Sequence, residues 1–283
     1  MCTPELTIVT RSVIVLTSLV TKWIGKRVYQ KKPRSIMKLS NLKYLFFSLL
    51  LTTALLYVVL PDLELYFMFF KDSIFNGEFS NKMTQYDMVT AKLLLKRFAS
   101  EMESANMTYF LYSGSLLGSY RHRGIVPWDD DIDVIVPFRQ RPDLRTTLSE
   151  LEPLFTLDTS MDIRWKFYSI LSEAIKTKSW KWPFLDISFY FENETHIWDT
   201  DRRWRLTSIY NKSIVFPLGK GSFMNMSLPV PKDPYAFLSF NFDVNICKSN
   251  SYDHKQETSI PYLFQTSVPC YILRKRFQFV NHD

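Results

Sequence analysis

Apolar and polar positions follow two different periods along this chain, and each period predicts a different element. Between Tyr86 and Asn106 apolar residues recur every three or four positions, which indicates a helix that packs one face on a core. Short apolar runs bounded by turn residues predict strands. These runs are Thr108–Tyr112, Asp131–Val136 and Phe184–Phe191.

Further helices are expected between and after these runs. Ser115 is expected to cap a short helix that ends near Arg121. Pro142 opens another helix, and leucines follow it at three- and four-residue spacing. A short closing helix is expected over Tyr235–Phe240. Strands that alternate with helices indicate the α/β or α+β class, a mixed sheet with flanking helices.

One apolar stretch is long enough to cross a bilayer. Leu42–Leu60 carries a single charge, Lys43 at its edge, and about 20 apolar residues can span a membrane as a helix. A cleaved signal peptide is disfavoured because the run is too long and no small-residue cleavage site follows it. Residues up to Lys43 include nine Lys or Arg and one acid, and such positive charge stays in the cytosol. We therefore expect a single-pass type II membrane protein of the Golgi or ER.

That topology divides the chain into five parts. We expect a basic cytosolic tail over 1–41, a transmembrane helix over 42–60, a luminal stem over 61–85, a folded domain over 86–245 and a C-terminal tail over 246–283.

Charge and short motifs agree with this arrangement. Beyond Lys43 the chain has 26 basic and 27 acidic residues, so it lacks the basic footprint of a nucleic-acid-binding protein. Cys247 and Cys270 would share an oxidising compartment, where a disulfide and two buried free thiols are about equally expected. Four glycosylation sequons follow the apolar stretch, at Asn106, Asn193, Asn211 and Asn225.

The candidate chemistry lies in an acidic run at the start of the second expected strand. Asp131 and Asp133 are two positions apart on that strand, so both project to the same side. Two carboxylates held so close repel each other unless a divalent cation compensates them, most simply Mg²⁺ or Mn²⁺. A solvated acidic turn is the alternative. A calcium loop of the EF-hand kind is excluded because its Gly and Glu positions hold Val134 and Gln140.

A metal held by aspartates suits phosphoryl transfer, and phosphates also need donors. Gly114 and Ser115 can supply backbone N–H groups and a hydroxyl at a helix N-terminus. Arg121 and Arg123 follow, where they can reach a phosphate or form a solvated basic turn. Asp186 interrupts the third apolar run, which makes it the best candidate for a third carboxylate.

These residues carry a family resemblance. Ser113–Gly118 (SGSLLG) followed by Arg121–Asp133 (RHRGIVPWDDDID) closely resembles the signature of the LicD/fukutin family, a branch of the nucleotidyltransferase-fold superfamily. The resemblance covers about Tyr109 to Phe240. It implies a nucleotidyltransferase-like mixed sheet and a metal-dependent transferase. Such an enzyme moves phosphocholine, ribitol phosphate or a similar group from a CDP-linked donor to a glycan hydroxyl and releases CMP.

The resemblance also implies roles for individual residues. Asp131, Asp133 and Asp186 would be the catalytic acids. Asp131 and Asp133 would hold Mg²⁺ or Mn²⁺, and Asp186 would complete the metal site or take the proton from the acceptor hydroxyl. Gly114 and Ser115 would cradle the donor diphosphate. The motif does not determine whether Lys166 or Lys220 touches the phosphates. The segment Phe240–Asp243 lacks the glycine that often follows the closing helix in this family.

Two other functions stay open on the sequence alone. The first is a Golgi glycosyltransferase that binds Mn²⁺ and a sugar nucleotide through an Asp-x-Asp motif. The second is a catalytically silent luminal scaffold. The run of four acids disfavours a scaffold, since nothing in that role would hold repelling charges together.

Overall fold

The computed structural model describes residues 44, 47–54 and 77–282, and the chain divides into two units, Met1–Asp62 and Leu63–Asp283. In the first unit residues 44 and 47–54 are helical, with exposed side chains. Among the described residues no helix is both long and apolar enough to cross a membrane. The rest of the expected Leu42–Leu60 span, the basic tail and most of the stem lie outside the described residues.

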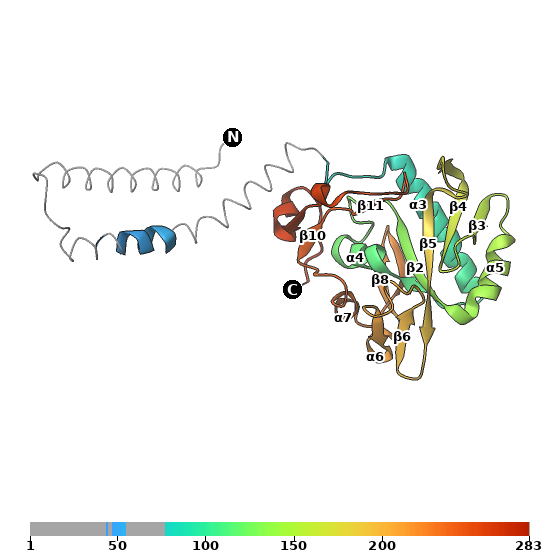
Figure 1. The fold of residues 1–283 in the computed structure, drawn as a ribbon. Helices are drawn as coiled ribbons and strands as arrows, with labels where there is room; N and C mark the ends of the chain where they lie inside the picture. The colour runs from blue at the N-terminus through green and yellow to red at the C-terminus, as the bar shows by residue number, and fades with distance from the viewer. Residues whose placement is uncertain (1–43, 45–46, 55–76, 283) are drawn as a thin grey trace, which may run out of the picture. The chain divides into compact units, whose positions relative to one another are not determined.

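The second unit is built on a seven-stranded mixed sheet (Figure 1). The main strand order is β1-β2-β5-β4-β3, with β6 paired to β5 and β7 paired to β6. Strand β2 runs parallel to β5, and the other pairs of this sheet are antiparallel. The strands are β1 (Phe110–Leu111), β2 (Ile132–Pro137), β3 (Phe155–Asp158), β4 (Arg164–Ala174), β5 (Lys181–Glu192), β6 (His196–Asp199) and β7 (Ile209–Asn211). The predicted mixed sheet with helices is confirmed.

Helices and three small sheets complete the described part of this unit. The helices are α3 (Gln85–Ser104), α4 (Ser113–His122), α5 (Arg141–Ser149), α6 (Lys212–Val215) and α7 (Pro234–Leu238). The 3₁₀ helices are η1 (Phe138–Gln140), η2 (Tyr262–Phe264) and η3 (Cys270–Lys275). The small sheets pair β8 (Gly219–Phe223) with β9 (Met226–Val230), β10 (Ile246–Lys248) with β13 (Ser267–Pro269), and β11 (Tyr252–Asp253) with β12 (Thr258–Ser259).

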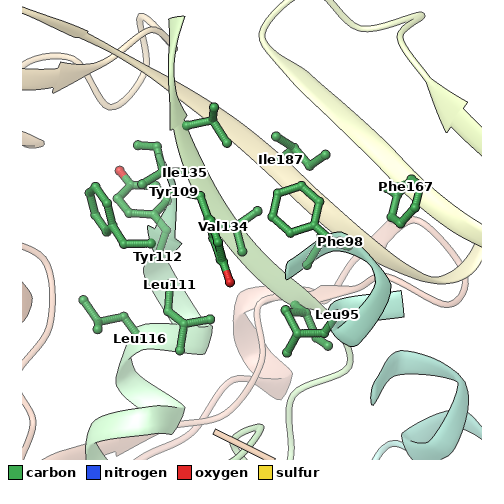
Figure 2. Close-up of a cluster of buried hydrophobic side chains, with 14 of the residues drawn as sticks. Leu95, Phe98, Tyr109, Leu111, Tyr112, Leu116, Val134, Ile135, Phe167 and Ile187 are labelled. Atoms are coloured by element: carbon green, nitrogen blue, oxygen red, sulfur yellow. The ribbon is translucent and has the colours of Figure 1, made fainter. Parts of the chain in front are cut away.

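The main core lies between α3 and one face of the sheet. Figure 2 shows Leu95 and Phe98 of α3 beside Val134 of β2, with Ile187 of β5 close by. Successive residues of a strand point to opposite faces, and Asp186 precedes Ile187 on β5. The packing of these apolar side chains therefore directs the neighbouring acidic positions to the face away from α3.

The segment from 246 onward packs on the domain that precedes it. Cys247 and Cys270 form a disulfide with their Cα atoms 5.0 Å apart, so the alternative of two free thiols is wrong. Trp128 is buried in a second apolar cluster with this disulfide, and its Nε1 donates to the Lys248 carbonyl at 2.8 Å. The loop closed by the disulfide is thereby attached directly behind the acidic run.

Several local expectations differ from the structure. Ser115 does not cap α4, because Tyr112 is the N-cap residue and no side chain caps that end. Instead the backbone N–H of Asp133 donates to the Ser115 hydroxyl at 2.8 Å, which joins the helix to β2. Strand β4 was not expected, since its charged and polar residues hide the apolar pattern that marks the other long strands.

Candidate active site

Strand pairing brings the three predicted carboxylates together. In the parallel pair β2–β5, Asp133 lies opposite Asp186, so both side chains leave the same face of the sheet. Asp131 comes just before β2, and oxygens of Asp131, Asp133 and Asp186 all lie within 4.8 Å of one another. All three residues are buried. Three carboxylates at this separation form one compact oxygen-rich group.

Asp186 has one oxygen paired with a lysine and one without a partner among the described residues. Lys166 on β4 lies opposite it in the antiparallel pair, and Lys166 Nζ is 2.8 Å from Asp186 Oδ2. The other oxygen, Oδ1, is buried and has no hydrogen-bond partner among the described residues. An unsatisfied buried acceptor costs about 1–3 kcal/mol, and more when it is charged. A cation that prefers oxygen ligands, such as Mg²⁺ or Mn²⁺, fits this unpaired carboxylate oxygen.

Gly114 and Ser115, in the first turn of α4, lie against the acids. A Cβ atom on Gly114 would lie 2.6 Å from Asp129 Oδ2 and 3.6 Å from Asp133 Oδ2, so a larger residue would displace a carboxylate. Ser113, before it, has a φ of 45°. The first amides of a helix have no carbonyl partner within that helix. Together these features put unpaired N–H donors beside the carboxylate group.

The two predicted arginines do not join this group. Both lie at the other end of α4, where Arg123 is eight residues beyond Ser115, about 12 Å along the helix axis. Arg123 is exposed and is the C-cap residue. Arg121 is buried over the ring of Trp128, and its Nη1 donates to Cys270 Sγ at 3.3 Å. Its guanidinium therefore has partners in the second apolar cluster.

Asp131 and Asp133 have strongly perturbed pKa values. Burial raises the pKa of Asp131 to about 7, nearby His254 opposes this, and Asp129 and Asp186 add to it. Burial also raises the pKa of Asp133 well above its ordinary value, and repulsion from Asp131 and Asp186 contributes. Carboxyl groups with raised pKa values cluster at functional sites, because charge is concentrated there against a dry interior.

A histidine from the disulfide loop reaches the same group. His254 Nδ1 lies 2.8 Å from Asp130 Oδ1, and its Nε2 lies 3.2 Å from Asp131 Oδ2. Burial lowers the pKa of His254, but Asp131 and Asp130 outweigh it and raise the pKa to about 10. Asp129, Asp131 and His254 form a second set of atoms that could hold a metal. Sequence reasoning missed His254, since it lies 121 residues after Asp133 in a polar loop that no periodicity marks.

Comparison with known families identifies this region. Residues 106–233 match the family model described as LicD/FKTN/FKRP, nucleotidyltransferase domain. The matched residues contain Gly114 and Ser115, β2 with its acids, and β5 with Asp186. The predicted resemblance to the LicD/fukutin family is confirmed, and residues 106–233 carry the domain that this family model describes.

Two curated proteins with similar sequences support the resemblance to this family. The lipopolysaccharide cholinephosphotransferase LicD of Haemophilus influenzae is 46% identical over 41 residues, 14% of this chain and 16% of that protein. The ribitol-5-phosphate transferase FKTN of Mus musculus is 24% identical over 155 residues, 54% of this chain and 32% of that protein. This chain therefore matches less than a third of the length of each of these two relatives.

A solved structure of an adenylyltransferase is also similar. The lincosamide antibiotic adenylyltransferase LnuA, with lincomycin bound, aligns with a TM-score of 0.35 and 14% sequence identity, over 58% of this chain and 90% of LnuA.

Proposed function

We propose that this protein is a metal-dependent transferase that moves a phosphorylated alcohol from a CDP-linked donor to a glycan hydroxyl and releases CMP. The observation that carries the proposal is the buried trio Asp131, Asp133 and Asp186, in which one Asp186 oxygen has no partner in the described part of the chain. The match to the LicD/FKTN/FKRP family model supports a transferase of phosphorylated alcohols.

Asp131, Asp133 and Asp186 are the proposed ligands of Mg²⁺ or Mn²⁺. A cation held by these three carboxylates would neutralise negative charge on the transferred group. The chain itself keeps the three carboxylates together in a buried position. Lys166 offsets part of their charge through Asp186, and it leaves the second Asp186 oxygen available.

Gly114 and Ser115 are the proposed diphosphate-binding residues. The N-terminus of a helix favours anions because its amides are unpaired and the helix dipole is positive there. The Ser115 oxygen accepts from the Asp133 amide, and its O–H proton stays available as a donor. The same serine can therefore connect the metal-binding strand to a donor phosphate.

The proposed reaction is a displacement at phosphorus. The acceptor hydroxyl oxygen forms a bond to the phosphorus that carries the alcohol, and the bond from this phosphorus to the bridging oxygen breaks. CMP leaves with the bridging oxygen and the electron pair of the broken bond. The proton of the acceptor hydroxyl passes to water, because one Asp186 oxygen is paired with Lys166 and the other is the proposed ligand of the cation.

We place this reaction in the lumen of the Golgi or ER, with the chain anchored as a single-pass type II membrane protein. The disulfide between Cys247 and Cys270 suits an oxidising compartment. The four sequon asparagines, Asn106, Asn193, Asn211 and Asn225, are all exposed, as glycosylation requires.

The test is CMP release by the full-length chain, purified in detergent and given CDP-choline, CDP-ribitol or CDP-glycerol with a pool of glycoprotein acceptors. We expect release from one donor with Mn²⁺ or Mg²⁺, none with EDTA, and loss of at least about a thousandfold in Asp133→Asn. Asp143→Asn is the matched control, because Asp143 is an exposed carboxylate on α5. Turnover of a sugar nucleotide alone would instead indicate a glycosyltransferase, and absence of metal-dependent nucleotide binding would indicate a scaffold.

A further inference from the structure

Arg164 is a cation beside the carboxylate group that the proposed reaction does not yet use. It is the first residue of β4, two positions before Lys166, so the two side chains leave the same face of the sheet. In the antiparallel pair β4–β5, Arg164 lies opposite Ser188 and Lys166 lies opposite Asp186. Arg164 therefore lies one step along the face that carries the acids.

Within the described part of the chain, the guanidinium of Arg164 has an N–H donor without an acceptor. Its Nε is buried and has no hydrogen-bond partner among the described residues. Its ion pair with Asp201 is long, with 3.9 Å between Nη2 and Asp201 Oδ2, and its side chain is 24% exposed. A guanidinium has five N–H donors in a planar fork, so most of this capacity is unused.

The nearby carboxylates outside the trio already have other donors. Asp201 is held by Arg203, whose Nη2 lies 2.7 Å from Oδ2 and whose backbone N–H donates to Oδ1 at 2.9 Å. Asp199 accepts from the Tyr112 hydroxyl at 2.9 Å and from the Asp201 amide at 2.7 Å. These acids balance the charge of Arg164 without binding its fork closely.

The charge of Arg164 also acts on the carboxylate trio. Burial disfavours the charged guanidinium, but Asp186 and Asp133 outweigh it, together with Asp199 and Asp201, and the pKa of Arg164 is raised. In return Arg164 lowers the pKa of Asp133, against the larger effect of burial. The side chain is thus a permanent cation at the border of the site, partly open to solvent and able to meet an anion there.

We propose that Arg164 binds the phosphoryl oxygens of the substrate that the carboxylate site receives, as a further substrate-binding residue. The planar fork matches two phosphate oxygens at once, and such charge-assisted pairs are among the strong hydrogen bonds of proteins. Lys166 does not fill this role, because it is buried and engaged with Asp186. The long pair with Asp201 leaves the donors of the Arg164 guanidinium available to a substrate. This inference rests on the proposed function for the identity of the phosphate, but its test does not need turnover.

The test compares Arg164→Gln and Arg164→Lys with the wild-type full chain in detergent. Mn²⁺ binding is measured first, by the loss of the free Mn²⁺ paramagnetic resonance signal, and then binding of inorganic pyrophosphate and of CDP at saturating Mn²⁺. We expect Arg164→Gln to weaken pyrophosphate and CDP binding at least tenfold, while Mn²⁺ binding stays equal or tightens, because a repelling charge is removed. Arg164→Lys keeps the charge but loses the planar guanidinium fork, so its affinity for pyrophosphate and CDP should lie between those of wild type and Arg164→Gln.

Arg203→Gln is the matched control. It removes a cation from the same carboxylate, Asp201, but its side chain is 68% exposed and is bound to that carboxylate. It should leave pyrophosphate binding within about twofold of wild type, as surface pairs contribute little. Equal pyrophosphate binding by wild type and Arg164→Gln would overturn the inference, and so would a parallel loss of Mn²⁺ binding, which would mark a structural role. Wild-type protein that binds neither probe with Mn²⁺ would overturn it too. Retained binding without turnover of any CDP-alcohol would contradict only the proposed function.

Discussion

Lys166 Nζ lies 2.8 Å from Asp186 Oδ2, and both residues are buried. The other carboxylate oxygen of Asp186, Oδ1, has no hydrogen-bond partner in the described residues. Asp133 lies opposite Asp186 on the other neighbouring strand. A central strand thus carries a carboxylate between a cation on β4 and a second carboxylate on β2. The strand order β2-β5-β4 therefore separates the Asp186 oxygen that is paired with Lys166 from the oxygen that is available to the proposed metal.

Removing Lys166 should destabilise the folded protein, because the negative charge of the site is then less compensated. Lys166→Met leaves Asp186 buried without its cation, and breaking a buried pair in this way costs about 3–5 kcal/mol. We expect the free energy of unfolding in EDTA, measured by urea denaturation, to fall by about that amount. Saturating Mn²⁺ should recover more stability in this variant than in wild type.

The control for that experiment is Lys212→Met. Lys212 Nζ lies 2.6 Å from Glu192 Oε2, but this pair is at the surface, so its loss should cost at most about 1 kcal/mol. Equal losses in the two variants, with no extra recovery by Mn²⁺ in Lys166→Met, would contradict the assigned role of the buried pair.

A side chain at Gly114 should impair the site without unfolding the protein. In Gly114→Ala the new methyl group would lie 2.6 Å from Asp129 Oδ2, so the carboxylate or the helix must shift. We expect Mn²⁺-dependent CDP binding to weaken by about 1–3 kcal/mol, the usual cost of overpacking. Gly124→Ala is the control, because the nearest atom to a methyl group there is 4.0 Å away. Calorimetric titration of both variants would decide, and equal affinities would argue against close approach at Gly114.

Without a divalent cation, the folded protein should lose stability as the pH rises. A carboxyl group with a raised pKa holds its proton to higher pH in the folded state, so its favourable contribution is lost as the pH rises through the folded value. Burial raises the pKa of Asp131 to about 7 and that of Asp129 to about 6. His254 acts in the same direction: burial lowers its pKa, but Asp131 and Asp130 raise it to about 10. Its contribution is complete below about pH 6.5 and declines above it.

Thermal unfolding in EDTA at several pH values checks this expectation. We expect the melting temperature to fall between about pH 5 and pH 8, and saturating Mn²⁺ to flatten the slope. Asp131→Asn should reduce the slope in EDTA, whereas Asp143→Asn, on the exposed face of α5, should leave it unchanged. A melting temperature that rises over this range in both wild type and Asp131→Asn would show that other groups dominate.

Local sequence predicts those site residues that lie in an apolar strand pattern or at the start of a helix. A single acid that interrupts a long apolar run marks Asp186 as a candidate, and β5 contains it. The sequence places Gly114 and Ser115 at a helix N-terminus, and α4 begins there, although Ser115 bonds to β2 rather than capping α4. The approach of His254 could not be predicted, because it depends on a loop that is held by a disulfide and by Asp130.

Strand β4 shows a related limit. Its first half alternates between two environments, with Trp165 and Phe167 in the core and Arg164 and Lys166 on the acidic face. Two basic residues in a short segment resemble a surface loop in sequence. Only the pairing with β5 reveals that their charge is balanced by the carboxylates, so this half of the site depends on tertiary structure.

The disulfide should stabilise the loop that carries His254, and thereby the domain. Closing a loop with a sequence separation of 23 restricts the unfolded chain, and a bridge of this size contributes about 2–4 kcal/mol. We expect Cys247→Ser/Cys270→Ser to lower the free energy of unfolding by that amount and to increase hydrogen exchange at His254 and Lys255, whose amides donate to Asp130. Cys2→Ser, which leaves the bridge intact, should change neither quantity. If the double variant exchanges these amides at the wild-type rate, the contacts with Asp130 hold the loop without the bridge.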